Sequence, residues 1–202
     1  MKMLDGWLDQ ANKVPSPNFN IRPANACVNL LVIHNISLPP DEFGGPFIEL
    51  FFQNKLLHDA HPYFDHLKAV EVSSHFLIKR DGQISQFVSC NDRAWHAGES
   101  EFCGEHNCND FSIGIELEGS DTIPYTTEQY RALEALTLSI REAYPAITKD
   151  RITGHQDIAP DRKTDPGESF DWQRYLDKLP VLHTYIKGPY FERHDTSRST
   201  LN

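Results

Sequence analysis

A nearly unbroken apolar run, residues 28–33 with the sequence VNLLVI, constrains the fold of this chain more than any other feature. A strand that is apolar and β-branched along its length is buried on both faces. A sheet that contains such a strand needs a covering layer on each side. His34 and Asn35 stand at the end of the run, and Pro39 and Pro40 then turn the chain into a loop. The run therefore predicts a central strand of a layered α/β domain.

Four further segments have strand character, at residues 72–78, 83–88, 111–119 and 151–153. Asp81-Gly82 joins the first two and predicts a hairpin with a type I′ turn, which needs positive φ at both central positions. In residues 111–119 the apolar positions alternate with Glu116 and Glu118. Because successive side chains of a strand point to opposite faces, these two glutamates lie on one face and the isoleucines on the other.

Two helices are expected between the strands. A short one follows Pro46 in the apolar stretch 47–57, and a long one begins at a capping box of Thr126 and Gln129 and ends at Pro145. The order of elements predicts one α/β domain over residues 1–202, in which a central mixed sheet is flanked by helices. We expect its core at about residues 28–180 and peripheral termini, with fraying after about residue 188.

The overall composition excludes several classes of function. The chain has 202 residues and a formal charge of −10, with 39% apolar and 24% charged residues, which is typical of a globular domain and unlike a nucleic-acid-binding one. We expect no nucleic acid and no membrane among its partners. No signal peptide or membrane-spanning run is recognisable, which predicts a cytoplasmic protein.

The four cysteines are expected to be thiols in a reducing compartment. They are Cys27, Cys90, Cys103 and Cys108. Cys103 and Cys108 flank His106, but no second pair completes a four-ligand zinc knuckle.

Three separate segments each place a metal-ligand side chain near the end of a strand or in a loop: His34, His155 and Asp165. Two imidazoles and one carboxylate suit a catalytic zinc site, which uses three protein ligands and keeps one position open. Local sequence alone also allows plainer roles, because a lone histidine is often packed in the core and Asp165 precedes a Pro-Gly turn. Spacing along the chain does not decide between these interpretations.

Taken together, these segments resemble the AmpD family of N-acetylmuramoyl-L-alanine amidases, which share a fold with phage amidases and peptidoglycan recognition proteins. The resemblance covers residues 30–179. It is carried, in family order, by VIHNIS, VSSHFLIKRDGQISQFV, RAWHAGES, NDFSIGIELEG and ITGHQDIAPDRKTDPGESFDW. The last segment is the most specific.

The resemblance implies a role for five residues. One zinc ion would be held by His34, His155 and Asp165. Glu116 would activate the zinc-bound water, and Lys163 would stabilise the negative charge of the tetrahedral intermediate. Lys163 and Asp165 are two positions apart, so an extended loop would place both side chains on one side. The alternatives are an exposed carboxylate for Glu116 and a surface ion pair for Lys163.

Substrate contacts are expected from Asn35 and Trp95, although a tryptophan is also an ordinary core residue. His75 and His96 are expected to be buried imidazoles that do not ligate the metal. Asn107 stands where some members of the family have an arginine, so the binding of an anionic stem peptide is expected to differ here.

The resemblance further implies hydrolysis of the amide bond between (1,6-anhydro-)N-acetylmuramic acid and L-alanine in muropeptides, in cytoplasmic cell-wall recycling. The expected partner is this small-molecule substrate. Two alternatives are a peptidoglycan-binding module without catalysis and a secreted amidase that degrades the intact wall. The complete set of two histidines, aspartate, glutamate and lysine argues against the first, and the missing signal peptide against the second. A zinc-binding structural protein of the cytosol is a weaker alternative.

Overall fold

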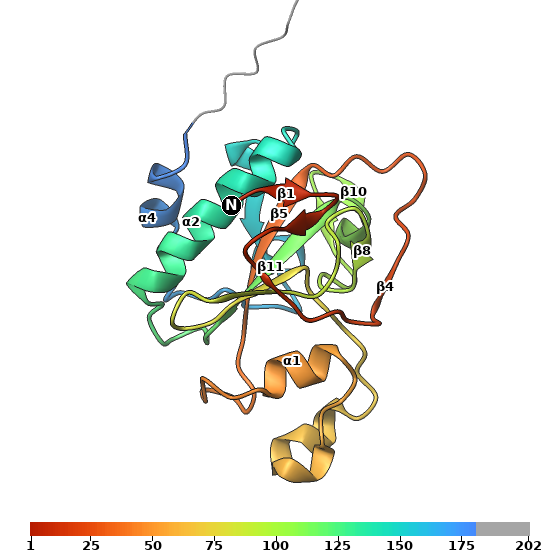
Figure 1. Cartoon of the computed structure of the whole chain (residues 1–202), viewed down its shortest axis with the longest axis vertical. Coiled ribbons are helices and arrows are strands. Elements are labelled where there is room, and N and C mark those ends of the chain that lie inside the picture. The colour runs from red at the N-terminus through yellow and green to blue at the C-terminus, as the bar shows by residue number, and fades with distance from the viewer. Residues whose placement is uncertain (181–202) are drawn as a thin grey trace, which may run out of the picture.

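The computed structural model describes residues 1–180, and a six-stranded mixed sheet forms its centre (Figure 1). The strand order is β12-β5-β11-β6-β7-β3. The bounds are β3 Asn12–Lys13, β5 Leu30–Ile36, β6 Phe76–Ile78, β7 Ile84–Gln86, β11 Ser112–Glu118 and β12 Ile152–Gly154. Strands β12, β5, β11 and β6 run parallel, and β6 and β7 form an antiparallel hairpin. The predicted α/β class with a mixed sheet is confirmed.

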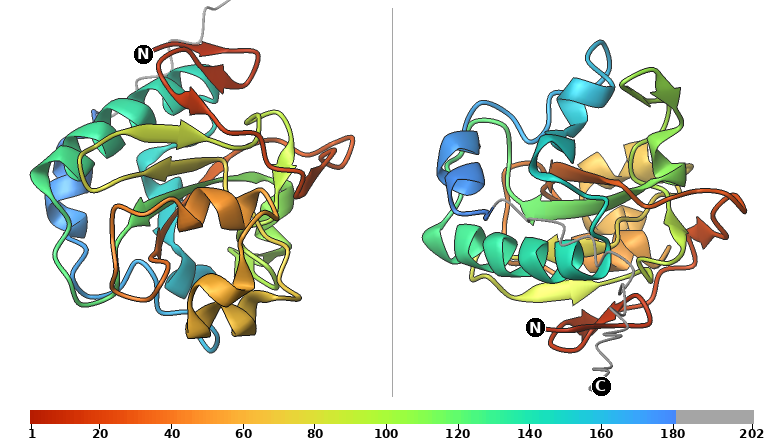
Figure 2. Two further views of the ribbon diagram at one scale, coloured as in Figure 1. Left: turned by 60° about the horizontal axis from the view of Figure 1, so that its bottom comes forward. Right: turned by 90° about the horizontal axis from the view of Figure 1, so that it is seen from above.

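Helix α2 (Thr127–Ala143) lies across one face of the sheet, and the short helix α4 (Trp172–Asp177) lies beside it (Figures 1 and 2). The predicted capping box is present: Gln129 N–H donates to Thr126 Oγ1 over 3.0 Å, and Thr126 N–H donates to Gln129 Oε1 over 3.1 Å. One apolar cluster joins α2 to this face of β5 and β11. It includes Leu31, Ile33, Ile113, Ile115, Leu117, Leu133, Leu136 and Ile140.

The alternate side chains of β5 point to the opposite face of the sheet. Leu30 and Val32 pack there in a separate cluster with Phe111. Helix α1 (Phe47–Phe52), the short helix expected after Pro46, packs through Phe52 in a further cluster that contains Leu77 of β6. The 3₁₀ turns η1 (His58–Ala60) and η2 (Pro62–Leu67) follow α1 at the lower end of Figure 1. A strand buried on both faces, as the run at 28–33 predicts, is therefore confirmed for β5.

The hairpin at Asp81-Gly82 is confirmed, but the predicted type I′ turn is wrong. Of its central residues only Gly82 has positive φ, at 85°. Gly82 N–H donates to the Lys79 carbonyl and Lys79 N–H donates to the Gln83 carbonyl, both over 2.9 Å. These bonds close a three-residue loop, Arg80 to Gly82, in which Gly82 is the single residue with a left-handed backbone conformation. Residues 72–75 are not part of strand β6.

Short elements that the sequence did not predict occupy the N-terminal region and two loops. They are β1 (Met3–Leu4), β2 (Trp7–Leu8), β4 (Phe19–Asn20), β8 (Arg93–Ala94), β9 (Glu101–Phe102), β10 (Glu105–His106), and the turns η3 (Cys108–Asp110) and η4 (Lys149–Arg151). Leu8 is fully buried in the α2 cluster, and β3 extends the sheet beside β7. Residues before 28 thus contribute to the core. The fraying expected after residue 188 lies outside the described residues.

Within residues 1–180, no helix has the length and apolar character needed to cross a membrane.

Candidate active site

Three neighbouring parallel strands carry the candidate site on the face of the sheet opposite α2. In the register, His34 of β5 is paired with Glu116 of β11, and Gly154 of β12 is paired with Ile33. His155, the first residue of the short helix α3 (His155–Ile158), therefore lies next to His34. Both histidines and Glu116 are buried. The parallel arrangement brings the ends of distant segments to one edge of the sheet, where sites of α/β proteins form.

The side chains of His34, His155 and Asp165 converge on one point. His34 Nδ1 lies 3.0 Å from both His155 Nδ1 and Asp165 Oδ2, and His155 Nδ1 lies 3.1 Å from Asp165 Oδ2. Over residues 1–180 this is the single group of three or more histidine, cysteine or acidic side chains close enough to share a metal ion.

Cys103 and Cys108 are free thiols, as expected.

The proton positions on the imidazoles test whether this group fits a cation. His155 Nε2–H donates to the Ala97 carbonyl over 3.0 Å, and a carbonyl can only accept. In neutral His155, Nδ1 therefore presents a lone pair to the lone pairs of Asp165 Oδ2. A proton or a metal ion must lie between such atoms. Two imidazoles, one carboxylate and their mutual distances match the donor set of a catalytic zinc site.

The charge states of the group agree with metal binding. Burial lowers the pKa of His34 to about 4, although its close contact with the Asp165 carboxylate acts in the opposite direction. Burial raises the pKa of Asp165, but its close contacts with the imidazoles of His155 and His34 outweigh this effect and hold the pKa well below its usual range. At neutral pH the site therefore presents a neutral imidazole at His34 and a carboxylate at Asp165, which are the states that bind metals.

The loop that carries Asp165 is held by hydrogen bonds to the backbone carbonyl of this residue and to that of the next one. The Asp165 carbonyl accepts the Gln156 N–H over 2.9 Å. The next carbonyl, of Pro166, accepts from Tyr125 Oη–H over 2.8 Å and from Asn35 Nδ2–H over 3.1 Å. Gly167 has a φ of 80°, which other residues rarely adopt. These contacts fix the carboxylate of Asp165 against β5.

Glu116 differs from its neighbour Glu118 in how its carboxylate is satisfied. Both are buried, so the alternative of an exposed strand carboxylate is wrong for Glu116. Glu118 accepts the Gly44 N–H over 2.6 Å and the Arg80 N–H over 3.0 Å. Glu116 Oε2 is buried without a hydrogen-bond partner.

The pKa of Glu116 lies well above its usual range, first because of burial and then because of the negative charge of Asp165, while the positive charge of Lys163 acts in the opposite direction. A raised carboxyl pKa in a buried site is typical of a group that exchanges protons during catalysis.

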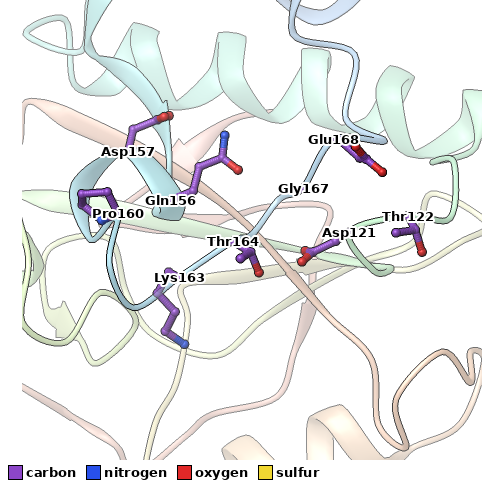
Figure 3. Close-up of a pocket in the computed structure, with 9 residues that line it drawn as sticks. All are labelled: Asp121, Thr122, Gln156, Asp157, Pro160, Lys163, Thr164, Gly167 and Glu168. Atoms are coloured by element: carbon purple, nitrogen blue, oxygen red, sulfur yellow. The ribbon is translucent and has the colours of Figure 1, made fainter.

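Lys163 lines two hollows on the surface beside the convergent group. One has a volume of about 520 Å³ and is also lined by Asn35 and Asp165, and the other, of about 530 Å³, is drawn in Figure 3. In Figure 3 the Lys163 side chain extends away from the side chains of Asp157 and Glu168. The hollow shared with Asn35 and Asp165 is open to solvent next to the donor atoms, so it offers room for a ligand.

Asn35, Trp95, His75 and His96 were also expected at or near the site. Besides its bond to Pro166, Asn35 Nδ2–H donates to Asp121 Oδ1 over 2.8 Å. Trp95 lies near β4, where its Nε1–H donates to Asn20 Oδ1 over 2.9 Å. His75 and His96 are both buried, and His96 contacts the Nε2 atom of His34.

Sequence reasoning missed several groups that hold the site together. The carbonyls of Ala97 and Pro166 accept from His155, Asn35 and Tyr125, and no side-chain pattern reveals a backbone acceptor. Asp157 Oδ2 accepts from Gly154 N–H over 2.9 Å at the start of α3. An aspartate three positions after the residue that precedes a helix could have indicated this contact.

Comparisons with known proteins identify relatives of this chain. A family model described as N-acetylmuramoyl-L-alanine amidase matches residues 24–168. The chain is 55% identical over 170 residues to the 1,6-anhydro-N-acetylmuramyl-L-alanine amidase AmpD of Salmonella typhimurium, covering 84% of this chain and 90% of that protein. It is 54% identical over 175 residues to AmpD of Escherichia coli, covering 87% and 95%.

Two solved structures extend the comparison. The crystal structure of a selenomethionine derivative of AmpD superposes with a TM-score of 0.87 and 52% identity, covering 89% of this chain and 100% of that chain. The amidase AmiD of E. coli, solved with the substrate anhydro-N-acetylmuramic acid-L-Ala-D-γ-Glu-L-Lys, superposes with a TM-score of 0.55 and 29% identity, covering 78% of this chain and 60% of that chain.

Proposed function

Because the chain belongs to the family of N-acetylmuramoyl-L-alanine amidases, we propose that it is a zinc-dependent enzyme that cleaves the amide bond between 1,6-anhydro-N-acetylmuramic acid and L-alanine. Its substrates are muropeptides derived from peptidoglycan, and its place is cell-wall recycling in the cytoplasm. The amidase activity follows from the family and from relatives more than 50% identical over most of the chain. The metal, the anhydro sugar and the location are the proposed part.

One observation supports the proposal most strongly. Two imidazole nitrogens and a carboxylate oxygen converge within 3.1 Å of one another, on the same face of the sheet as a buried glutamate with an unpartnered oxygen. A structural metal site is normally closed by four protein ligands, whereas three ligands leave a position for water. The three donors His34, His155 and Asp165 therefore favour catalysis over a purely structural role.

The proposed residues divide the reaction between them. When bound by these three ligands, zinc supplies a Lewis acid that makes hydrolysis by water possible at neutral pH. Glu116 takes a proton from the attacking water as the new C–O bond forms at the lactyl carbonyl carbon. The Lys163 ammonium stabilises the negative charge that develops on the carbonyl oxygen. Glu116 then gives its proton to the alanine nitrogen as the C–N bond breaks, which returns the carboxylate to its starting state.

Asn35 and Trp95 are proposed to contact the substrate. Asn35 lines the hollow of about 520 Å³ together with Lys163 and Asp165, so its amide oxygen can accept from a stem-peptide N–H. Trp95 is partly exposed and would place an aromatic face against a sugar. The name of the Salmonella relative and the ligand of the AmiD structure both contain an anhydro-N-acetylmuramyl group joined to L-alanine, which is the substrate class proposed for this hollow.

Removal of metal tests the central part of the proposal. The protein is treated with a zinc chelator, dialysed and incubated with an anhydro-N-acetylmuramyl tripeptide, and released peptide is measured by mass spectrometry. We expect at least a hundredfold loss of rate and recovery when about one equivalent of Zn²⁺ is added. Circular dichroism of the metal-free protein controls for unfolding. Undiminished hydrolysis by folded, metal-free protein would contradict the proposal.

A comparison of substrates separates the alternatives. We expect anhydromuropeptides to be cut much faster than polymeric peptidoglycan, because a recycling enzyme meets only released fragments. Equal rates on both would favour an amidase of the intact wall. Binding of the muropeptide without any release of peptide by the zinc-loaded protein would favour a non-catalytic binding module.

A further inference from the structure

Two consecutive residues contact the outer nitrogens of both imidazoles of the proposed metal centre. His34 Nε2 lies 2.9 Å from Nδ1 of His96, and His155 Nε2–H donates to the carbonyl of Ala97 over 3.0 Å. The rings of His34 and His96 meet edge to face, with centroids 5.0 Å apart and planes at 84°. The segment 96–97 therefore supports both proposed histidine ligands from behind.

This segment is itself held rigidly. Asn109 Oδ1 accepts the backbone N–H groups of His96 and Ala97, over 3.0 and 2.8 Å. His96 Nε2 lies 3.1 Å from Ser112 Oγ of β11. The His96 ring also lies so close to β11 that a Cβ atom at Gly114 would come within 2.6 Å of its Cγ and Nδ1 atoms. His96, Ala97, Asn109 and Ser112 are all buried, so close packing holds the His96 ring in one position.

We propose that His96 is a positioning residue whose Nδ1 accepts the Nε2–H of His34 and thereby directs the lone pair of His34 Nδ1 to the metal. The proposal rests on the metal site proposed above. Metal-bound histidines are commonly held in one tautomer by an acceptor behind the ring, usually a carboxylate, a carbonyl or a water. Here the acceptor is a second neutral imidazole, which has only one lone pair to offer.

The hydrogen bonds behind the metal then run in one direction. With the proton of His34 on Nε2, His96 accepts at Nδ1, carries its own proton on Nε2 and donates it to Ser112 Oγ. A serine hydroxyl can also donate, so the same three groups could be bonded in reverse. In the reverse arrangement His34 would carry its proton on Nδ1, the atom that faces His155 and Asp165, and could not ligate. Metal binding requires the first arrangement, and His96 allows it by accepting the proton of His34 Nε2 in a hydrogen bond.

The experiment measures the affinity of metal-free protein for Zn²⁺, by competition with a chromophoric chelator, in a set of His96 variants. His96→Asn can place its Oδ1 acceptor near the original Nδ1, whereas His96→Gln places its amide near the original Nε2, and His96→Leu has no acceptor. We expect Leu and Gln to weaken Zn²⁺ binding by about 10- to 100-fold and Asn to recover most of the affinity. The visible spectrum of the Co²⁺-loaded protein should change in parallel.

His75 provides the matched control. Its buried ring lies 5.6 Å from that of His96, and it accepts the Gly114 N–H over 3.0 Å, but it does not touch His34, His155 or Asp165. His75→Leu should lower the unfolding temperature about as much as His96→Leu and leave the Zn²⁺ affinity nearly unchanged. Unfolding of every metal-free variant is followed by circular dichroism.

Three results would overturn the inference. The first is wild-type affinity in both His96→Leu and His96→Gln, or in His96→Gln alone if the leucine variant does not fold. The second is equal weakening by His96→Leu and His75→Leu, which would mean general destabilisation. The third is equal weakening in the Asn and Gln variants. Absence of Zn²⁺ binding in the wild-type protein would instead refute the proposed function, and the inference with it.

Discussion

Replacement of Glu116 by glutamine should change activity and stability in opposite directions. The amide has the shape of the carboxyl group but cannot take a proton from water, so the proposed proton transfers fail. The same change removes a carboxylate that is buried with one oxygen unpartnered. A buried charge without full hydrogen bonding opposes folding. We therefore expect Glu116→Gln to be nearly inactive and at least as stable as the wild type.

The expected sizes follow from the two roles. General acid–base catalysis by one side chain contributes about 10²- to 10⁴-fold in rate, which corresponds to roughly 3–5 kcal/mol in the barrier. Loss of the buried charge should raise the free energy of unfolding at pH 7 by about 1 kcal/mol. The pKa of Glu116 is raised in the folded protein by burial and by Asp165. Its protonated form thus stabilises the fold fully below the unfolded pKa of about 4.5, and this contribution is lost as the pH rises.

The assay combines turnover, metal content and urea unfolding of metal-free protein between pH 5 and 7. The stability difference between Glu116→Gln and the wild type should widen as the pH rises. Glu118→Gln is the control on the same face of β11. Its carboxylate accepts two backbone N–H groups, from Gly44 and Arg80, so its loss should lower the free energy of unfolding by about 1–3 kcal/mol. Near-normal turnover by metal-loaded Glu116→Gln would refute the assignment of the base.

Three further predictions follow from the structure. Lys163→Met should lower the rate about 10²- to 10³-fold with metal content unchanged. It should also move the acidic limb of the pH–rate profile to higher pH, because the charge of Lys163 lowers the pKa of Glu116. An acidic limb at the wild-type pH would contradict this coupling. Gly167→Ala should destabilise by more than about 2 kcal/mol in urea unfolding, because φ is 80° and a Cβ would lie 2.2 Å from Cα of Asp121. Burial and then Arg22 lower the pKa of His75 to about 3. The contribution of the neutral His75 ring to the free energy of unfolding is therefore complete above the unfolded pKa of about 6.5 and declines as the pH falls. His75→Leu should therefore flatten the loss of stability between pH 6.5 and 5 by up to roughly 1.4 kcal/mol per pH unit.

The sequence predicts those elements whose signals are local. The apolar run that becomes β5, the alternation in β11 and the cap of Thr126 and Gln129 each depend on neighbours within a few residues. The hairpin at Asp81 was predicted for the same reason. The type I′ turn predicted for it was wrong. Gly82 packs against the first turn of α2, where a Cβ atom on Gly82 would lie 3.0 Å from the Glu128 carbonyl oxygen, and the local sequence does not reveal this contact.

Elements and contacts that depend on tertiary packing could not be predicted. Strands of two residues, such as β3, have no periodicity to detect and form only because a partner strand is present. The convergence of His34, His155 and Asp165 requires the register of two strands, β5 and β12, and the fold of one loop, so only the resemblance to a family indicated it. The carbonyl of Ala97 behind His155 has no side-chain signature at all.

One face of strand β11 explains why the site lies where it does. Every residue of β11 is buried, so each polar group on the face away from α2 needs a partner. Ser112 contacts His96, Gly114 leaves space for the same ring, and Glu118 accepts two backbone N–H groups. Over residues 1–180 the single carboxylate that keeps a buried oxygen without a partner is Glu116, in register with His34. The polar groups of this face are thus satisfied except at Glu116, the residue proposed to act on the attacking water, where an unmet hydrogen bond would be available to it.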